Sequence, residues 1–209
     1  MIEPTKFALF TAVSWALIIA PGPDMLYVIT RGMAHGRRAG IISAIGVICG
    51  ILVHTTAAAL GITLIFQTSA FAFLVVKYLG AIYLIYLGVQ AWRNKSTFSL
   101  QSRTPMMNSR ALFWQGVLSN VLNPKIAVFF LAFLPQFVDQ GSSQVALQMA
   151  ILGLTLAFFG LCFLVIVEYF AGAVGAWLTR SPQYTNILRW LTGGILISLG
   201  VRLALTEQR

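Results

Sequence analysis

Residues 18–30 read IIAPGPDMLYVIT, an apolar stretch that is interrupted by Pro21-Gly22-Pro23 and followed at once by Asp24. Each proline lacks a backbone N–H and clashes with the preceding turn, and the glycine between them lets the chain unwind. We therefore expect one helix to end here and a second to begin near Pro23. The free N–H groups at such a helix start attract anions, and the same dipole favours Asp24 in the first turn. A structural kink with a capping aspartate is one interpretation. Because a carboxylate inside a membrane costs roughly 2.5–3.5 kcal/mol, a functional site is favoured over it.

A second broken helix is predicted at residues 120–125, which read NVLNPK. Asn123 precedes Pro124, and the residue before a proline is disfavoured in helical geometry. Lys125 then lies deep in an apolar segment, where a lysine needs a partner or a lowered pKa. Asp24 is the expected partner, either as a static ion pair or as a pair that opens and closes as the protein works. Asn120 and Asn123 are expected to lie at the same site.

The composition is that of a membrane protein. Hydrophobic residues make up 58% of the 209 residues and charged residues 9%, whereas a soluble domain carries roughly 25% charged residues. A transmembrane helix needs about 20 mostly apolar residues, and six segments qualify: residues 7–30, 40–66, 71–92, 111–138, 145–178 and 185–206. These runs are too long and too uniform for barrel strands of about ten alternating residues. The chain is predicted to be an all-α membrane protein of six transmembrane helices, in a single domain over residues 1–209.

Basic residues in the connections predict the orientation. One side of the predicted membrane holds Arg31, Arg37, Arg38, Arg93, Lys95, Arg103, Arg110, Arg180 and Arg189, and the other only Lys6, Lys77, Arg202 and Arg209. The richer side is expected to be cytoplasmic, which leaves both termini in the periplasm. The net charge of +9 is scattered between apolar segments, so it does not indicate nucleic-acid binding.

The chain also contains an internal repeat. The third segment reads KYLGAIYLIYLGVQAW from Lys77 and the sixth reads RWLTGGILISLGVRLA from Arg189, with identical residues at six aligned positions. Pro23-Asp24 in the first segment similarly matches Pro124-Lys125 in the fourth. Two halves of three helices each must have opposite orientations, which predicts two inverted three-helix repeats, about 1–92 and about 111–209, joined by a cytoplasmic loop over about 93–110. Transporters of this kind bind their substrate where the halves meet.

Two further ionisable residues are candidates for a proton relay. Glu168 lies in LVIVEYFAG of the fifth segment and either carries a coupling proton or marks the cytoplasmic end of that segment. His54 is the second candidate, because histidine is the residue type best suited to proton relay near neutral pH, although a lone histidine on a helix is more often a core residue. No H-E-x-x-H or comparable grouping is present, so we expect neither an enzyme, nor a metal site, nor a cofactor.

Taken together, these motifs resemble the lysine-exporter/RhtB family. The resemblance runs along nearly the whole chain and rests on P-G-P-D at 21–24, His35-Gly36-Arg37-Arg38, the glycines of the second segment, N-x-x-N-P-K at 120–125 and F-x-P-Q-F at 133–137. It implies a bacterial inner-membrane exporter of amino acids or their derivatives, such as homoserine, threonine or leucine, driven by proton exchange. It also implies a transport site built from Pro21, Gly22, Pro23, Asp24, Asn123, Pro124 and Lys125. An acidic residue that some relatives carry earlier in the fifth segment is absent here.

Other functions stay open at this point. Cys49 and Cys162 fall at equivalent places in the second and fifth segments, as in a membrane thiol-disulfide carrier, but no neighbouring group favours a reactive thiolate. A passive channel is the other alternative. The expected partners are a small amino acid or derivative, protons and the lipid bilayer, and a homo-oligomer is left open.

Overall fold

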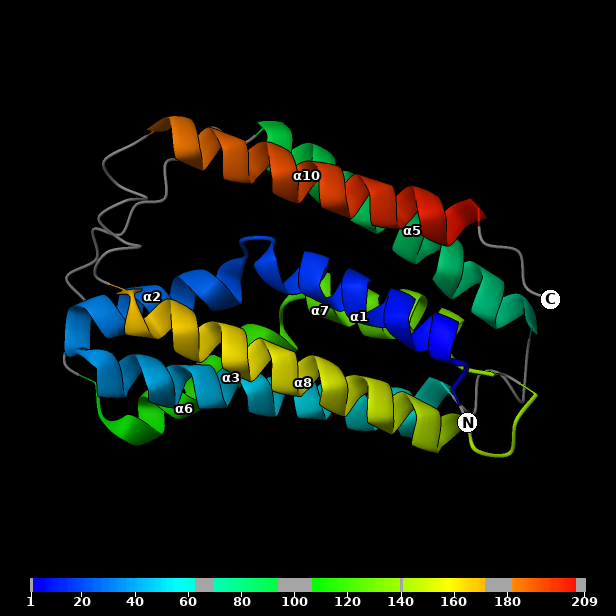
Figure 1. Ribbon diagram of the computed structural model, residues 1–209, viewed down its shortest axis with the longest axis horizontal. Coiled ribbons are helices and arrows are strands. Elements are labelled where there is room, and N and C mark those ends of the chain that lie inside the picture. The colour runs from blue at the N-terminus through cyan, green and yellow to red at the C-terminus, as the bar shows by residue number, and fades with distance from the viewer. Residues whose placement is uncertain (1, 63–69, 94–106, 140, 172–181, 206–209) are drawn as a thin grey trace.

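The computed structural model describes residues 2–62, 70–93, 107–139, 141–171 and 182–205, and these residues form helices joined by short connections. Successive segments run along one bundle in alternating directions (Figure 1). The elements in order are α1 (Pro4–Ile19), α2 (Pro23–His35), α3 (Arg37–Ala57), the π-helical turn η1 (Ala58–Ile62), α5 (Ala70–Arg93), α6 (Ser109–Val121), α7 (Pro124–Val128), the π-helical turn η2 (Phe129–Phe133), the 3₁₀ turn η3 (Leu134–Phe137), α8 (Val145–Tyr169) and α10 (Pro182–Leu205).

Both predicted helix breaks are confirmed. The axes of α1 and α2 meet at 50° across residues 20–22, and the axis of α6 meets that of Pro124–Phe137 at 49°. Pro23 and Pro124 are the first residues of the second helix in each pair, where a proline loses no hydrogen bond. The local sequence rules therefore account for both bends.

The described residues contain three helices that are long and apolar enough to cross a membrane, or five spans if each bent pair counts as one. The predicted sixth span corresponds to α10, which is not among them, so six spans stay a prediction. Residues 63–66 of the second predicted span, 172–178 of the fifth, Thr206 of the sixth and 94–106 of the predicted loop lie outside the described residues.

Close packing of α3 against α6 depends on glycines. A Cβ added at Gly46 would overlap the carbonyl oxygen of Phe113, and one at Gly116 would fall 2.6 Å from the carbonyl oxygen of Ser43 and 3.2 Å from the Cα of Gly46. Glycine thus lets the two backbones meet directly, as small residues do where membrane helices pack closely. The site described below lies along this contact.

We expect Gly46→Ala to lower the free energy of unfolding by about 1–3 kcal/mol, because the added methyl group meets backbone that cannot rotate away. The measurement is thermal unfolding of the purified protein in detergent. Gly61→Ala is the matched control, since a Cβ at Gly61 meets nothing within 4 Å. Equal melting temperatures for the two variants would show that this contact does not limit stability.

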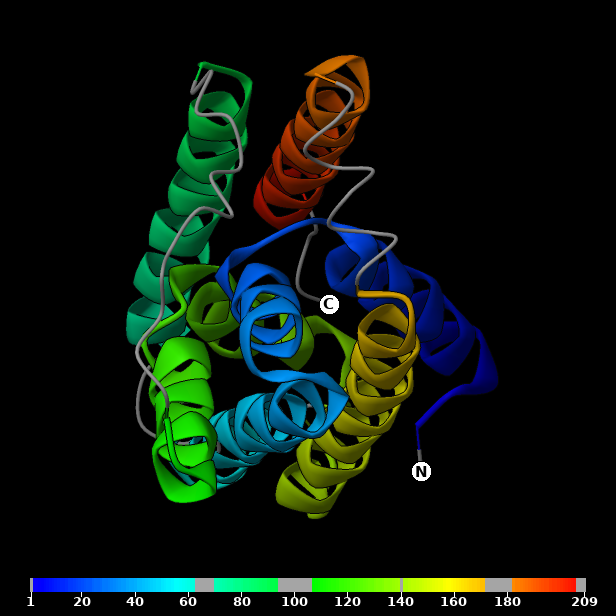
Figure 2. The same cartoon turned by 90° about the vertical axis from the view of Figure 1, so that its left-hand side faces the viewer.

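α5 and α10 form a pair that packs beside the other helices (Figure 2). Their contacts are reciprocal. A Cβ at Gly88 would lie 2.6 Å from Ile197 and 2.7 Å from the Gly193 oxygen, while a Cβ at Gly200 would lie 2.8 Å from both Ile85 and the Ala81 oxygen. Each contact is the repeat-related copy of the other, as a two-fold axis between the helices requires. This supports an inverted repeat, which for the chain as a whole stays a prediction.

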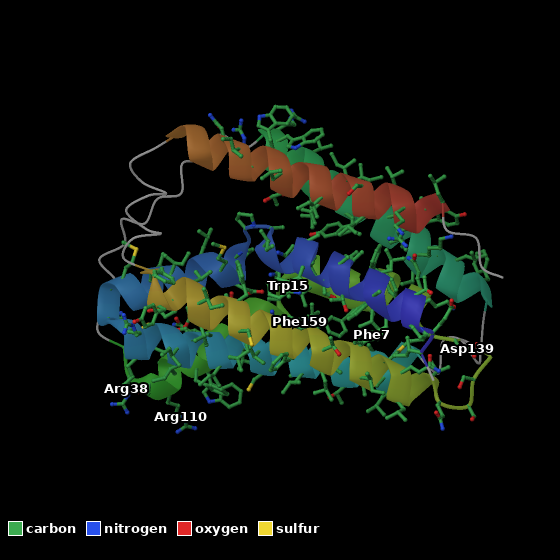
Figure 3. The ribbon with its side chains drawn as sticks, viewed as in Figure 1. Phe7, Trp15, Arg38, Arg110, Asp139 and Phe159 are labelled. Carbon is green, nitrogen blue, oxygen red and sulfur yellow. The ribbon has the colours of Figure 1, made fainter. Side chains whose placement is uncertain are left out.

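The two ends of the bundle differ in charge. Arg38 at the start of α3 and Arg110 at the start of α6 lie at one end, and Asp139 lies at the other (Figure 3). The end with the arginines also holds the α2–α3 turn, whereas α1 begins and α10 ends at the opposite end (Figure 1). Residues that the sequence assigns to the cytoplasmic side thus share one end of the bundle, and the side of the membrane that this end faces stays a prediction.

Candidate functional site

Asp24 lies where the two helix breaks meet. It occupies the first turn of α2, and its carboxylate accepts three hydrogen bonds from the broken α6–α7 segment. Ser119 Oγ donates to Oδ1 at 3.2 Å, while Asn120 Nδ2 and Asn123 Nδ2 donate to Oδ2 at 2.8 and 2.9 Å. All three donors are neutral groups, so none of them cancels the charge of an ionised Asp24.

Lys125 lies beside Asp24 but binds different atoms. Its Nζ donates to the carbonyl oxygens of Leu17 at 3.2 Å and Ala20 at 3.0 Å, at the C-terminal end of α1. These carbonyls have no partner within the helix, and the negative end of the helix dipole favours a cation there. Lys125 therefore joins the first half of one broken helix to the second half of the other.

The predicted direct ion pair between Asp24 and Lys125 is not formed in this conformation. The unwound backbone of residues 20–22 exposes carbonyl oxygens that compete for the ammonium group, and the asparagines of α6–α7 take up the carboxylate. Two opposite charges at one site, each held by neutral partners, remain available to a ligand that carries both charges.

Small residues and caps place these side chains. A Cβ at Gly22 would fall 3.1 Å from Lys125 Nζ, and a Cβ at Gly50 would fall 2.6 Å from the Asn120 Cβ. Asn123 caps α7, because its Oδ1 accepts from the Lys125 backbone N–H at 3.0 Å. His54 Nε2 donates to the Asn120 backbone oxygen at 3.3 Å, so this candidate for a proton relay supports the helix break.

A cavity of about 50 Å³ lies next to both charges. Its walls come from α1, α2, α3, α7 and α8 and are otherwise apolar; the lining residues are Leu17, Ile18, Ala20, Gly22, Asp24, Met25, Val47, Ile51, Lys125, Ile126, Leu156, Gly160, Phe163 and Leu164. Such a site, mostly apolar with a few convergent polar groups, is typical of small-molecule binding. The described residues that line it include one carboxylate and one ammonium group.

The other candidates lie elsewhere. Glu168 is buried near the C-terminal end of α8 and does not line this cavity. Cys49 and Cys162 are free, partly buried thiols and do not line it either. No group of three or more His, Cys, Asp or Glu side chains in the described part of the chain is placed to hold a metal ion. Ser119 is the site residue that the sequence did not single out; its place one turn before Asn123 was the available signal.

The sequence of this chain is similar to those of known membrane proteins. Residues 15–207 match the family model described as LysE type translocator. The chain is 32% identical over 199 residues to the uncharacterized membrane protein YrhP of Bacillus subtilis, and the alignment covers 91% of this chain and 94% of that protein. It is 30% identical over 191 residues to the homoserine/homoserine lactone efflux protein of Salmonella typhimurium, covering 91% and 92% of the two chains. It is 28% identical over 194 residues to the leucine efflux protein of Klebsiella pneumoniae, covering 90% and 89%. No solved structure gives a significant match.

Proposed function

This chain belongs to the LysE-type translocator family, whose members are membrane transporters and not enzymes, and on that premise we propose that it exports neutral amino acids or their derivatives by proton antiport. The proposed substrates are zwitterions with a small or aliphatic side chain, such as homoserine, threonine or leucine. Relatives named for homoserine and leucine efflux support this class.

The observation that carries the proposal is the pairing of one carboxylate with one ammonium group on an apolar cavity. The substrate ammonium binds Asp24, and the substrate carboxylate binds Lys125 together with the free N–H groups at the start of α2. The side chain faces apolar residues, among them Val47, Ile51 and Leu156. A lysine or arginine substrate would need a second carboxylate, and the described lining residues provide only Asp24.

The cavity of about 50 Å³ is partly open. We propose that the helices around the two breaks move apart when a substrate binds and leaves. In the proposed cycle the substrate binds from the cytoplasm and leaves outside, and a proton then replaces its ammonium on Asp24 for the return step.

The remaining parts of the proposal concern setting and partners. We place the protein in a bacterial inner membrane with both termini in the periplasm, as the basic residues at one end of the bundle favour. A homo-oligomer is compatible with this arrangement. The proton relay predicted for Glu168 and His54 stays a prediction.

The proposal predicts the outcome of an export screen. Bacteria that express the chain are loaded with neutral, basic and acidic amino acids, and the amount of each that leaves the cells is measured. We expect efflux of neutral amino acids at least about tenfold above cells without the protein, with basic amino acids unchanged. Efflux should collapse when the proton gradient is dissipated. Selective efflux of lysine or arginine would contradict the proposed recognition.

A further inference from the structure

Glu168 is a buried carboxylate that the proposed transport site does not use. The residue is 2% exposed, and its Oε2 has no hydrogen-bond partner. An ionised carboxylate in such a place is strongly unfavourable unless it is paired. The buried arrangement therefore suits the neutral, protonated acid.

Two glycines leave the space that this carboxylate occupies. A Cβ added at Gly32 of α2 or at Gly40 of α3 would overlap the carboxylate of Glu168. Between them Gly36 joins the two helices with φ +85°, a conformation that residues with a side chain rarely adopt. The three glycines thus form a tight hairpin of α2 and α3 that closes on the end of α8.

The hairpin presents positive charge to α8. The Arg37 guanidinium lies 4.2 Å from the centre of the Tyr169 ring, and its Nη2 donates to the Tyr169 backbone carbonyl oxygen at 3.5 Å. Arg37 thus lies beside Tyr169, the residue that follows Glu168 in α8. From α2, Arg31 donates to Gln115 of α6 at 3.1 Å, and the half-buried His35 has an unpartnered Nε2.

An apolar cluster separates Glu168 from the transport cavity. Ile29 and Val167 are buried against each other, with Met25 and Phe163 packed on them. Met25 and Phe163 also line the cavity. A polar molecule that passes from this end of the bundle to the cavity must part α2 from α8 at this cluster.

We propose that the α2–α3 hairpin and the last turns of α8 form the cytoplasmic gate of the transporter, and that Glu168 is its pH-dependent latch. With a proton on Glu168, the neutral acid is buried between Gly32 and Gly40 and the gate is shut. When the proton passes to water on that side, the anion moves out toward water and Arg37, and the gate opens. The latch therefore stops export when the cytoplasm becomes acidic.

This latch is distinct from the proton exchanged at Asp24. In this proposal Glu168 exchanges its proton only with the cytoplasmic side, so it regulates transport without driving it. The inference rests on the proposed function only for the direction of the substrate path.

The gate can be tested without a transport assay. Ile29→Cys is introduced into protein whose Cys49 and Cys162 are replaced by alanine, and its rate of reaction with a membrane-impermeant maleimide is measured from each side of oriented vesicles. The same rate is measured for protein that also carries Glu168→Gln, which mimics the protonated acid. The ratio of the two rates no longer contains the pH dependence of the introduced thiol, because both proteins share it. From the α2–α3 end we expect this ratio to rise at least about fivefold between about pH 6 and about pH 8.

A ratio that stays constant over this range would overturn the latch. In Gly40→Ala the added methyl group overlaps the position of the Glu168 carboxylate, so this variant is expected to raise the labelling rate of the introduced cysteine at both pH values. Gly194→Ala is the control, because a Cβ there meets nothing within 4 Å, and its rate should equal that of the unchanged background. Slow labelling of Gly40→Ala at the lower pH would also contradict the proposal. A negative export screen leaves these rates interpretable, so failure of the transport proposal and failure of the latch are distinguishable.

Discussion

Asp24→Asn is expected to lower the rate of net export at least about 100-fold while leaving membrane insertion and thermal stability nearly unchanged. Asparagine has nearly the same shape but no charge, so the substrate ammonium loses its partner. With its amide oxygen at the position of Oδ2, asparagine still accepts from Asn120 and Asn123, and its NH2 group faces the Ser119 hydroxyl, which can accept. A protonatable group is lost as well, which removes the proposed return step.

The control for Asp24→Asn is Ser119→Ala, which removes only the 3.2 Å hydrogen bond to Oδ1. Loss of one such bond to a charged group should reduce export less than about 100-fold. A second comparison uses a substrate analogue without the amino group, for which the ratio of native to Asp24→Asn transport should fall toward one. Unchanged export by Asp24→Asn would remove Asp24 from the mechanism.

Lys125→Met is expected to have the second largest effect, a loss of export of about 30-fold or more. Methionine keeps much of the length and the apolar stem but removes the ammonium group that the proposed mechanism offers to the substrate carboxylate. It also leaves the carbonyl oxygens of Leu17 and Ala20 without their donor. The variant should therefore lose some stability in addition to transport.

In Lys125→Met, the loss of the contact with the substrate carboxylate and the loss of the α1 cap can be separated by the choice of substrate. An amino-acid amide lacks the carboxylate, so its transport should be weak in the native protein and should change little in Lys125→Met. If Lys125 only caps α1, the substitution should instead reduce the transport of the acid and of its amide by the same factor. Thermal unfolding in detergent measures the contribution of the cap.

The helix breaks could be predicted from sequence because their causes are local. Proline at 21, 23 and 124 constrains its own backbone and that of its neighbour, whatever the rest of the chain does. Gly46 and Gly50, one turn apart on a helix, indicate that another helix packs closely there, but not that this helix is α6. The convergence of Asp24, Asn120, Asn123 and Lys125 was expected from the matching positions of the two motifs.

The partners of the charged groups could not be predicted in the same way. The sequence suggested an ion pair between Asp24 and Lys125, but which atoms lie nearest depends on how the unwound backbone of α1 faces α7. The space that Gly32 and Gly40 leave for the Glu168 carboxylate was missed for a related reason. The spacing of Gly32, Gly36 and Gly40 was visible, yet nothing in the sequence places α8 against that hairpin. Such contacts between distant segments require the structure.

The most direct test of the account is net efflux from proteoliposomes that contain the purified protein and a neutral amino acid from the export screen. An inwardly directed proton gradient is imposed, and efflux is followed for the native protein and for Asp24→Asn. The account predicts that the gradient accelerates efflux by the native protein and that Asp24→Asn shows neither efflux nor a response to the gradient. Native efflux that ignores the gradient, or an Asp24→Asn variant that still responds to it, would contradict proton-coupled export through Asp24.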